Sequence, residues 1–333
     1  SLITPMTMRY VYAAIFFSAN IVAWVERENP ITYFSRQRRS GCSHHDCYAA
    51  EGVLTISFAY FLFSSIMFLS TVGTRTVHDR RHSWHFQWWW LKVLILFACL
   101  RISIFTPSDV IELYGKAAHF GAGVFLLIQL VSVIRFITRL SYKCYLKVII
   151  VSVAAYSASI VGIILMFYQY TGCLVNITFI VTTLVVVCLM TLISLLSKSG
   201  LMGVYIVFLC WSAIKSEPDT RCFKKGKAGS GDNWITIITF IVGLIGITYA
   251  TFSTGTDDYK CLNFRNVVET ENDVPYGYGF FHFVYAMGSM YFGMVFVGWD
   301  THHMSEKWSI DVGWTSTWVH IANEHLAVIS FGK

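Results

Sequence analysis

The chain reads Val274-Pro275-Tyr276-Gly277-Tyr278-Gly279-Phe280-Phe281-His282-Phe283 and then continues to Trp299 without a charged residue. A helix needs roughly 20 apolar residues to cross the hydrocarbon core of a bilayer, so this stretch predicts a transmembrane helix over 278–299. Ala286, Ser289 and Gly293 follow His282 at helical spacing on one face. Small residues at such spacing let two helix backbones approach closely. We therefore predict a membrane helix packed tightly against a neighbour.

The composition agrees with a membrane environment. The 333 residues are 55% hydrophobic and 13% charged, with a mean hydropathy of +0.56, and a water-soluble core of this size could not hide so many apolar side chains. The formal net charge is +6, but the basic residues lie in loops between apolar runs rather than in one stripe. This pattern favours contact with anionic lipid headgroups over nucleic-acid binding.

The apolar runs predict an all-α, polytopic membrane protein of about ten transmembrane helices, with 1–333 forming a single membrane domain. Tryptophans at the ends of these runs, Trp299 among them, indicate an interfacial aromatic belt. The predicted spans are 8–25, 52–72, 88–105, 109–140, 146–168, 174–196, 200–214, 234–252, 278–299 and a segment from 314 onward, which Ala322-Asn323-Glu324-His325 interrupts.

The fourth run is unusually long. Asp109 is a plausible N-cap with Glu112 three residues later, and the helical pattern then persists for more than thirty residues. At ~1.5 Å per residue this helix would measure about 48 Å, against a hydrocarbon core of about 30 Å. It must therefore cross the membrane steeply tilted or protrude into water.

Further motifs occur along the chain in a fixed order. Trp89 and Lys92 precede Phe105 and Pro107; Gly121-Ala122-Gly123-Val124-Phe125-Leu126-Leu127 follows; and Trp211-Ser212-Ala213 leads to Glu217-Pro218 and Cys222. With the 274–283 stretch, Trp299-Asp300 and the segment 307–318, these motifs resemble the serine incorporator family, in a plant-like or protist-like form. The four ordered matches extend from about residue 88 to residue 318.

This resemblance implies a eukaryotic multi-pass protein of an endomembrane or the plasma membrane, with a cytosolic N-terminus. It implies that 108–140 is a long diagonal helix dividing two groups of helices. It also implies handling of serine-derived lipids, phosphatidylserine and sphingolipids, through ATP-independent phospholipid scrambling between leaflets. Membrane phospholipids are the expected partners; lipid-synthesis enzymes and further copies of the chain are alternatives.

Polar groups inside apolar runs are the candidate site, because burying them is costly unless they are paired or wet. One interpretation is a lipid groove along the long helix; the other is that His119 and His282 are packing histidines at helix crossings. The groove candidates are Glu112, Lys116, His119, Gln129, Lys92, Arg101 and His282. The helix-packing candidates are Gly115, Gly123, Ala286, Ser289 and Gly293.

Cysteines and one sequon bear on orientation. Cys42, Cys47, Cys173 and Cys222 fall in loops on one predicted side, where disulfides would place an oxidising, lumenal compartment. Their connectivity stays open. His44 and His45 lie beside two of these thiols, but the spacing matches no common zinc module, so we expect no metal. Asn176 begins a glycosylation sequon close to the membrane. The cysteines within predicted spans, Cys99, Cys188 and Cys210, are expected to be small buried apolar residues.

The chain shows none of the sequence motifs of common hydrolases, metalloproteases or nucleotide-binding loops. We therefore expect a non-enzymatic protein without a cofactor. Passive phospholipid movement between leaflets is the leading hypothesis. A carrier for serine or another small solute, and a scaffold that gathers lipid-synthesis enzymes without moving lipid, are the alternatives.

Overall fold

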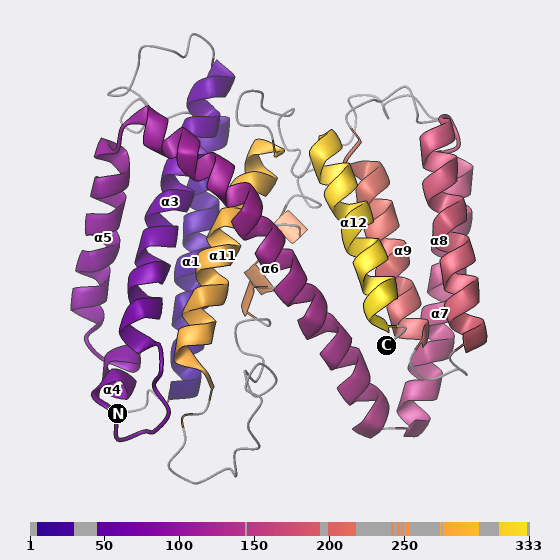
Figure 1. The fold of residues 1–333 in the computed structure, drawn as a ribbon, viewed down its shortest axis with the longest axis horizontal. Coiled ribbons are helices and arrows are strands. Elements are labelled where there is room, and N and C mark those ends of the chain that lie inside the picture. Colours follow the sequence, from indigo (N-terminus) through magenta and orange to yellow (C-terminus); the bar gives the residue numbers. More distant parts are fainter. Residues whose placement is uncertain are drawn as a thin grey trace. The chain divides into compact units, whose positions relative to one another are not determined.

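The computed structural model describes residues 5–29, 45–143, 145–193, 199–217, 276–299 and 313–331, with Val274 and short pieces at 241–242, 245–246, 248–249 and 251–252. Most of these residues are helical, and no strand occurs among them (Figure 1). The helices are α1 (Pro5–Glu28), α3 (His45–Thr71), α4 (Arg80–Phe86), α5 (Trp89–Phe105), α6 (Ser108–Lys143), α7 (Tyr145–Gln169), α8 (Leu174–Ile193), α9 (Ser199–Lys215), α11 (Tyr278–Val297) and α12 (Trp314–Phe331). The all-helical fold class predicted from the apolar runs is confirmed.

The chain forms two compact units. Unit 1 comprises residues 1–129 and 237–310, and unit 2 comprises residues 130–236 and 311–333. The long helix α6 begins in unit 1 and continues into unit 2 beyond Gln129. Each unit therefore combines segments that are far apart in the sequence.

The centre of unit 1 is the packing of α11 against α3, the most extensive helix pair in the described chain. Small residues permit this approach. A Cβ added to Gly293 would lie 2.7 Å from the Ser57 Oγ, and one added to Gly279 would lie 3.0 Å from the Val72 Cα. The Ser57 hydroxyl also donates to the Ser289 carbonyl at 2.7 Å. Close contact at this helix surface follows from the absence of larger side chains.

The predicted span at 88–105 has a different start. A short helix, α4, precedes α5, and the two are bent by 71° at the break between them. Asp79 caps α4 by accepting from the Arg81 N–H, and Trp88 adopts a left-handed backbone with φ of 60°. A non-glycine residue in this region rarely continues a helix, so α5 begins only at Trp89.

The long helix α6 extends over 36 residues. Its first turn differs in detail from the prediction, because the Pro107 carbonyl accepts from the Val110 and Ile111 N–H groups and so occupies the N-cap position. Asp109 lies inside the first turn, where its negative charge still interacts favourably with the helix dipole.

Unit 2 is built from α7, α8, α9 and α12 around an apolar core. The polar tetrapeptide that interrupts the apolar pattern at 322–325 does not end α12, which is continuous from Trp314 to Phe331. Its Asn323 and Glu324 side chains are buried instead. Packing against α8 and α9 thus overrides the polar break in the sequence.

Among the described residues, four helices are long and apolar enough to cross a membrane: α1, α3, α6 and α11. The bent pair α4 and α5 makes a fifth span if it is counted as one. Shorter apolar helices occur at 153–169, 174–190 and 201–215. Most of the predicted span at 234–252 lies outside the described residues. The structure is that of a polytopic membrane protein, with fewer full-length spans in its described part than the ten expected.

The two glycine environments in unit 1 give a matched test of helix packing. Replacing Gly293 with Ala should destabilise the protein by about 1–3 kcal/mol, because the new methyl group would overlap Ser57. Replacing Gly123 with Ala should be neutral or slightly stabilising, since an added Cβ there meets nothing within 4 Å and Ala favours helix by about 1 kcal/mol over Gly. Thermal unfolding in detergent, followed by tryptophan fluorescence, would compare them. Equal midpoints for both variants would contradict the packing assignment.

Candidate functional site

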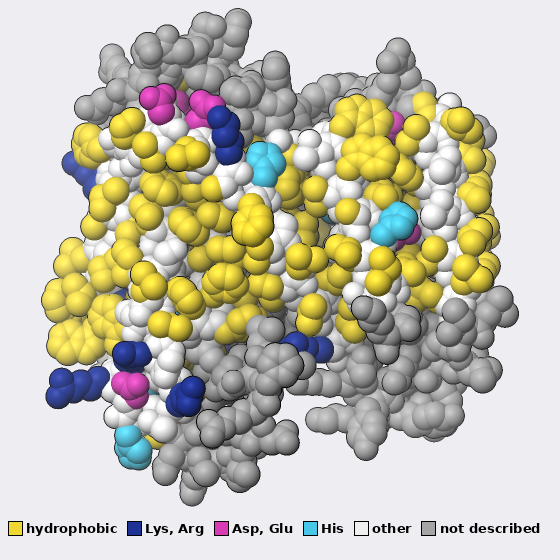
Figure 2. Space-filling view, in the orientation of Figure 1, with side chains coloured by type: hydrophobic (Ala, Val, Ile, Leu, Met, Phe, Trp, Pro, Cys, Tyr) yellow, Lys and Arg dark blue, Asp and Glu magenta, His cyan; other side chains and the backbone are white. Residues whose placement is uncertain are grey.

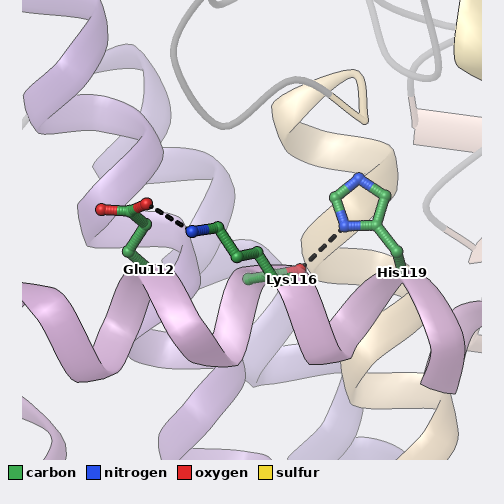
Figure 3. Close-up of polar contacts among 4 residues, drawn as sticks. Glu112, Lys116 and His119 are labelled. Atoms are coloured by element: carbon green, nitrogen blue, oxygen red, sulfur yellow. Dashed lines mark hydrogen bonds and ion pairs between the residues drawn. The ribbon is translucent and has the colours of Figure 1, made fainter.

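The N-terminal half of α6 presents an exposed ion pair. Lys116 Nζ lies 2.9 Å from Glu112 Oε1, one helical turn away, and their side chains are 71% and 48% exposed (Figure 3). A pair of this kind on a helix surface contributes about 0.2–0.5 kcal/mol. Both charges therefore remain available to other groups at little cost.

His119, one turn further along α6, is bound on both ring nitrogens. Its Nδ1 lies 2.9 Å from the Gly115 carbonyl, and its Nε2 lies 3.1 Å from the Trp299 carbonyl. A dashed line marks the first of these contacts in Figure 3. Carbonyl oxygens only accept hydrogen bonds, so both contacts are made at once only when both nitrogens carry protons. A neutral His119 ring makes only one of these two hydrogen bonds.

The Trp299 carbonyl is available because α11 ends in an unusual turn. Gly298 and Trp299 both have positive φ, at 65° and 60°, and the Trp299 N–H donates to the Met294 carbonyl. The turn directs the chain so that His119 of α6 binds it. Trp299 is buried, and the centre of its ring lies 5.9 Å from that of His119, so it helps to close α11 against α6.

A second polar group lies inside unit 1, around the α4–α5 bend. Lys92 is 1% exposed, and its ammonium donates to the His85 carbonyl at 2.7 Å. The Tyr12 hydroxyl donates to the same oxygen at 2.8 Å. The His85 ring lies 3.1 Å from His282 Nε2 and 2.8 Å from the Tyr276 hydroxyl. We call these five residues the His85 cluster.

The Lys92 ammonium is surrounded by aromatic faces. It lies 4.5 Å from the centre of the Trp89 ring and 5.5 Å from the centres of the Tyr12 and Trp84 rings. The bound carbonyl belongs to the last turn of α4, where a helix carries unsatisfied acceptors and partial negative charge. Lys92 therefore caps α4 and holds the bend, with cation–π contacts replacing part of its lost hydration.

Sequence comparison identifies the family to which the chain belongs. The sequence model described as Serine incorporator (Serinc) matches residues 2–266 and 263–332. The chain belongs to the serine incorporator family. It is similar to a probable serine incorporator of Dictyostelium discoideum, with 25% identity over 340 residues that cover 88% of this chain and 81% of the relative.

Other relatives are more distant. Serine incorporator 3 of Bos taurus is 22% identical over 367 residues, covering 84% of this chain and 77% of the relative. Membrane protein TMS1 of Saccharomyces cerevisiae is 22% identical over 252 residues, covering 66% and 53% respectively. The membrane-spanning helices and the family together show that the chain is an integral membrane protein.

In this serine incorporator, the residues predicted to line one groove occupy different environments. Glu112 and Lys116 are exposed, whereas Lys92 and His282 are buried in the His85 cluster. Arg101 is exposed on α5, with its guanidinium 5.3 Å from the centre of the Phe105 ring. Gln129 is partly buried, as is Gly123, which has no neighbour in reach of an added Cβ. Gly121 faces α11 instead, where a Cβ would collide with Met290.

The sequence did not indicate His85, Tyr276 or Tyr12 as partners of the two buried candidates. His85 lies in the short polar helix that the apolar pattern missed, and Tyr276 belongs to the 274–283 stretch. The chain Tyr276–His85–His282 can pass a proton, because each imidazole can donate at one nitrogen and accept at the other. No group of three His, Cys, Asp or Glu side chains among the described residues could hold a metal.

The described residues cover only some of the cysteines and the sequon on which predictions were made. Cys173 is disulfide-bonded. Cys42 and Cys222 lie outside the described residues, as does the Cys47 side chain, so the connectivity of these cysteines stays a prediction. Cys99 and Cys210 are free and buried, whereas Cys188 is free and exposed, contrary to its expected burial. Asn176 is 1% exposed at the start of α8. A glycan on its amide nitrogen would first require that side chain to leave the protein interior.

We expect Lys92 to contribute to the free energy of unfolding. Replacing it with Met keeps a long apolar side chain but removes the bond to the His85 carbonyl, which should cost about 1.5–3 kcal/mol as for other hydrogen bonds to charged groups. Replacing the exposed Arg101 with Gln should change stability by about 0.5 kcal/mol or less. The unfolding midpoints of both purified variants measure the difference. A Lys92→Met variant as stable as the parent protein would rule out the capping role.

Proposed function

We propose that this serine incorporator lets phospholipids move passively between the two leaflets, with the exposed polar face at the start of α6 as a contact for headgroups. The observation that carries the proposal is the exposed Glu112–Lys116 ion pair. The family name alone does not specify lipid movement. The physical properties of this pair support it.

Apolar side chains lie beside the pair on the helix surface. Leu113 and Phe120, on the same helix, are both strongly exposed, and hydrophobic side chains cover most of the described surface in the view of Figure 2. Charges in such surroundings are costly unless they are paired or hydrated. A zwitterionic or anionic headgroup, which carries an ammonium group and phosphate or carboxylate oxygens, can pair with both members.

The Glu112–Lys116 pair is suitable for headgroup contact because it is weak. An exposed helical pair is worth about 0.2–0.5 kcal/mol, so a headgroup can replace either partner with little loss. A tightly buried pair would instead resist exchange, because separating its charges costs several kcal/mol. The α6 face therefore offers both signs of charge without trapping the lipid.

Leaflet exchange in reconstituted vesicles tests the function. Fluorescent phosphatidylserine should lose its leaflet asymmetry faster in vesicles that contain the protein than in empty vesicles. The Glu112→Gln/Lys116→Gln double variant should be slower than the parent protein by about fivefold, which corresponds to loss of ~1 kcal/mol of headgroup interaction. The Arg80→Gln variant removes an exposed charge from α4 and should match the parent protein.

The outcomes separate the alternatives. Equal rates in protein-containing and empty vesicles would overturn lipid movement, and serine counterflow in the same vesicles would then indicate a solute carrier. Vesicles with neither activity would favour a scaffold. Fast exchange that the double variant leaves unchanged would keep the function and move the headgroup contact away from α6. Gel filtration of each variant before reconstitution controls for folding.

A further inference from the structure

Unit 2 contains a carboxyl group inside its apolar core. Glu324 of α12 is 4% exposed, and Ala327, one turn later on the same helix, is fully buried in the core formed with α8 and α9. A charged carboxylate in such a place costs several kcal/mol unless a cation or several donors compensate it. The hydrogen bonds around Glu324 show how this cost is avoided.

Glu324 bonds to Thr183 of α8. The distance between Thr183 Oγ1 and Glu324 Oε1 is 2.8 Å. The same Thr183 oxygen lies 2.9 Å from the Phe179 carbonyl, one turn earlier on α8. A threonine hydroxyl has one hydrogen to donate and two lone pairs that accept. If Glu324 were ionised, two acceptors would compete for that single hydrogen.

A neutral carboxylic acid removes the conflict. Thr183 then donates to the Phe179 carbonyl, and the Glu324 acid donates its own proton to Thr183 Oγ1. Both observed contacts become hydrogen bonds, and no charge is buried. We propose that Glu324 is a proton-binding site within unit 2, held as a neutral carboxylic acid at neutral pH by Thr183 and the apolar core.

The helices around Glu324 supply little positive charge. α8 contains no Lys, Arg, His, Asp or Glu, and α9 contains only Lys215, in its last turn over the Trp211 ring. The other titratable groups of α9 in this region are Cys210 and Tyr205, of which Tyr205 lies 3.5 Å from the neighbouring Asn323 amide. Their ordinary forms at neutral pH are uncharged.

Two histidines lie near Glu324 on α12 itself. His325 adjoins Glu324, but its Nδ1 bonds the Ile321 carbonyl of its own helix at 2.8 Å. His320 lies one turn earlier and is partly buried. The side-chain hydrogen bond of Glu324 goes to Thr183 rather than to either ring. Protonation of the carboxyl is therefore the direct way to remove its charge.

The site links the packing of unit 2 to proton concentration. In water a glutamic acid loses its proton near pH 4.3, so any rearrangement that hydrates Glu324 releases a proton at neutral pH. By linkage, raising the pH favours the hydrated arrangement and lowering it favours the packed one. This proton-binding site is separate from the proposed lipid movement, and it does not depend on the α6 face.

Infrared absorption of the protein in lipid vesicles at neutral pH tests the proposal. The C=O stretching band of a neutral carboxylic acid should be present in the parent protein, absent from the Glu324→Gln variant and retained in the Glu112→Gln variant, which removes an exposed, ion-paired carboxylate. Absence of the band from the parent protein would overturn the proposal. So would a band that persists in Glu324→Gln, since it would belong to another buried acid such as Glu26 or Glu217.

A chemical reaction keeps the test decisive if Glu324→Gln does not fold. Dicyclohexylcarbodiimide, a hydrophobic reagent, adds a carboxylic O–H across its C=N bond: the oxygen bonds to carbon, the proton moves to nitrogen, and rearrangement gives a stable N-acylurea without a leaving group. Treatment of the parent protein should remove the infrared band and place the adduct on the peptide that contains Glu324. Loss of the band with the adduct on a different carboxyl would contradict the assignment.

Discussion

The Ser57 hydroxyl of α3 connects the helices on which unit 1 depends. It donates to the Ser289 carbonyl of α11 at 2.7 Å and lies 2.8 Å from the Tyr114 hydroxyl of α6. Gly293 provides the room for this contact. In an environment without water, a backbone carbonyl and two hydroxyls that satisfy one another are worth more than an equal area of apolar contact, because each would otherwise be left unpaired.

With α11 held against α3, its two ends have defined partners. At its start, Gly279 lies against Val72, and His282 reaches the His85 cluster around the α4–α5 bend. At its end, the turn at Gly298 presents the Trp299 carbonyl to His119. The α11 helix therefore holds unit 1 together, with small residues where it packs on α3 and with His282 and Trp299 where its two ends meet α4 and α6.

Polar side chains in this protein follow two different physical rules. Glu112 and Lys116 are paired and exposed, and separating such a pair costs little. Lys92, His282 and Glu324 are buried, and each is satisfied by a specific partner: the His85 carbonyl, the His85 ring and the Thr183 hydroxyl. Hydropathy alone treats all five as interruptions, although only the first two are accessible.

The amino-acid sequence determined the all-helical membrane fold, the approximate limits of most helices and the small-residue face of α11, because these depend on local hydrophobicity and on helical period. It missed α4, whose seven residues are mostly polar and too few to show a period, and it misjudged the polar break at 322–325. Which polar residues meet was decided only by tertiary structure. His85 and His282 are 197 positions apart and Thr183 and Glu324 are 141 positions apart, and a buried group takes its partner from the neighbouring helix rather than from the neighbouring sequence.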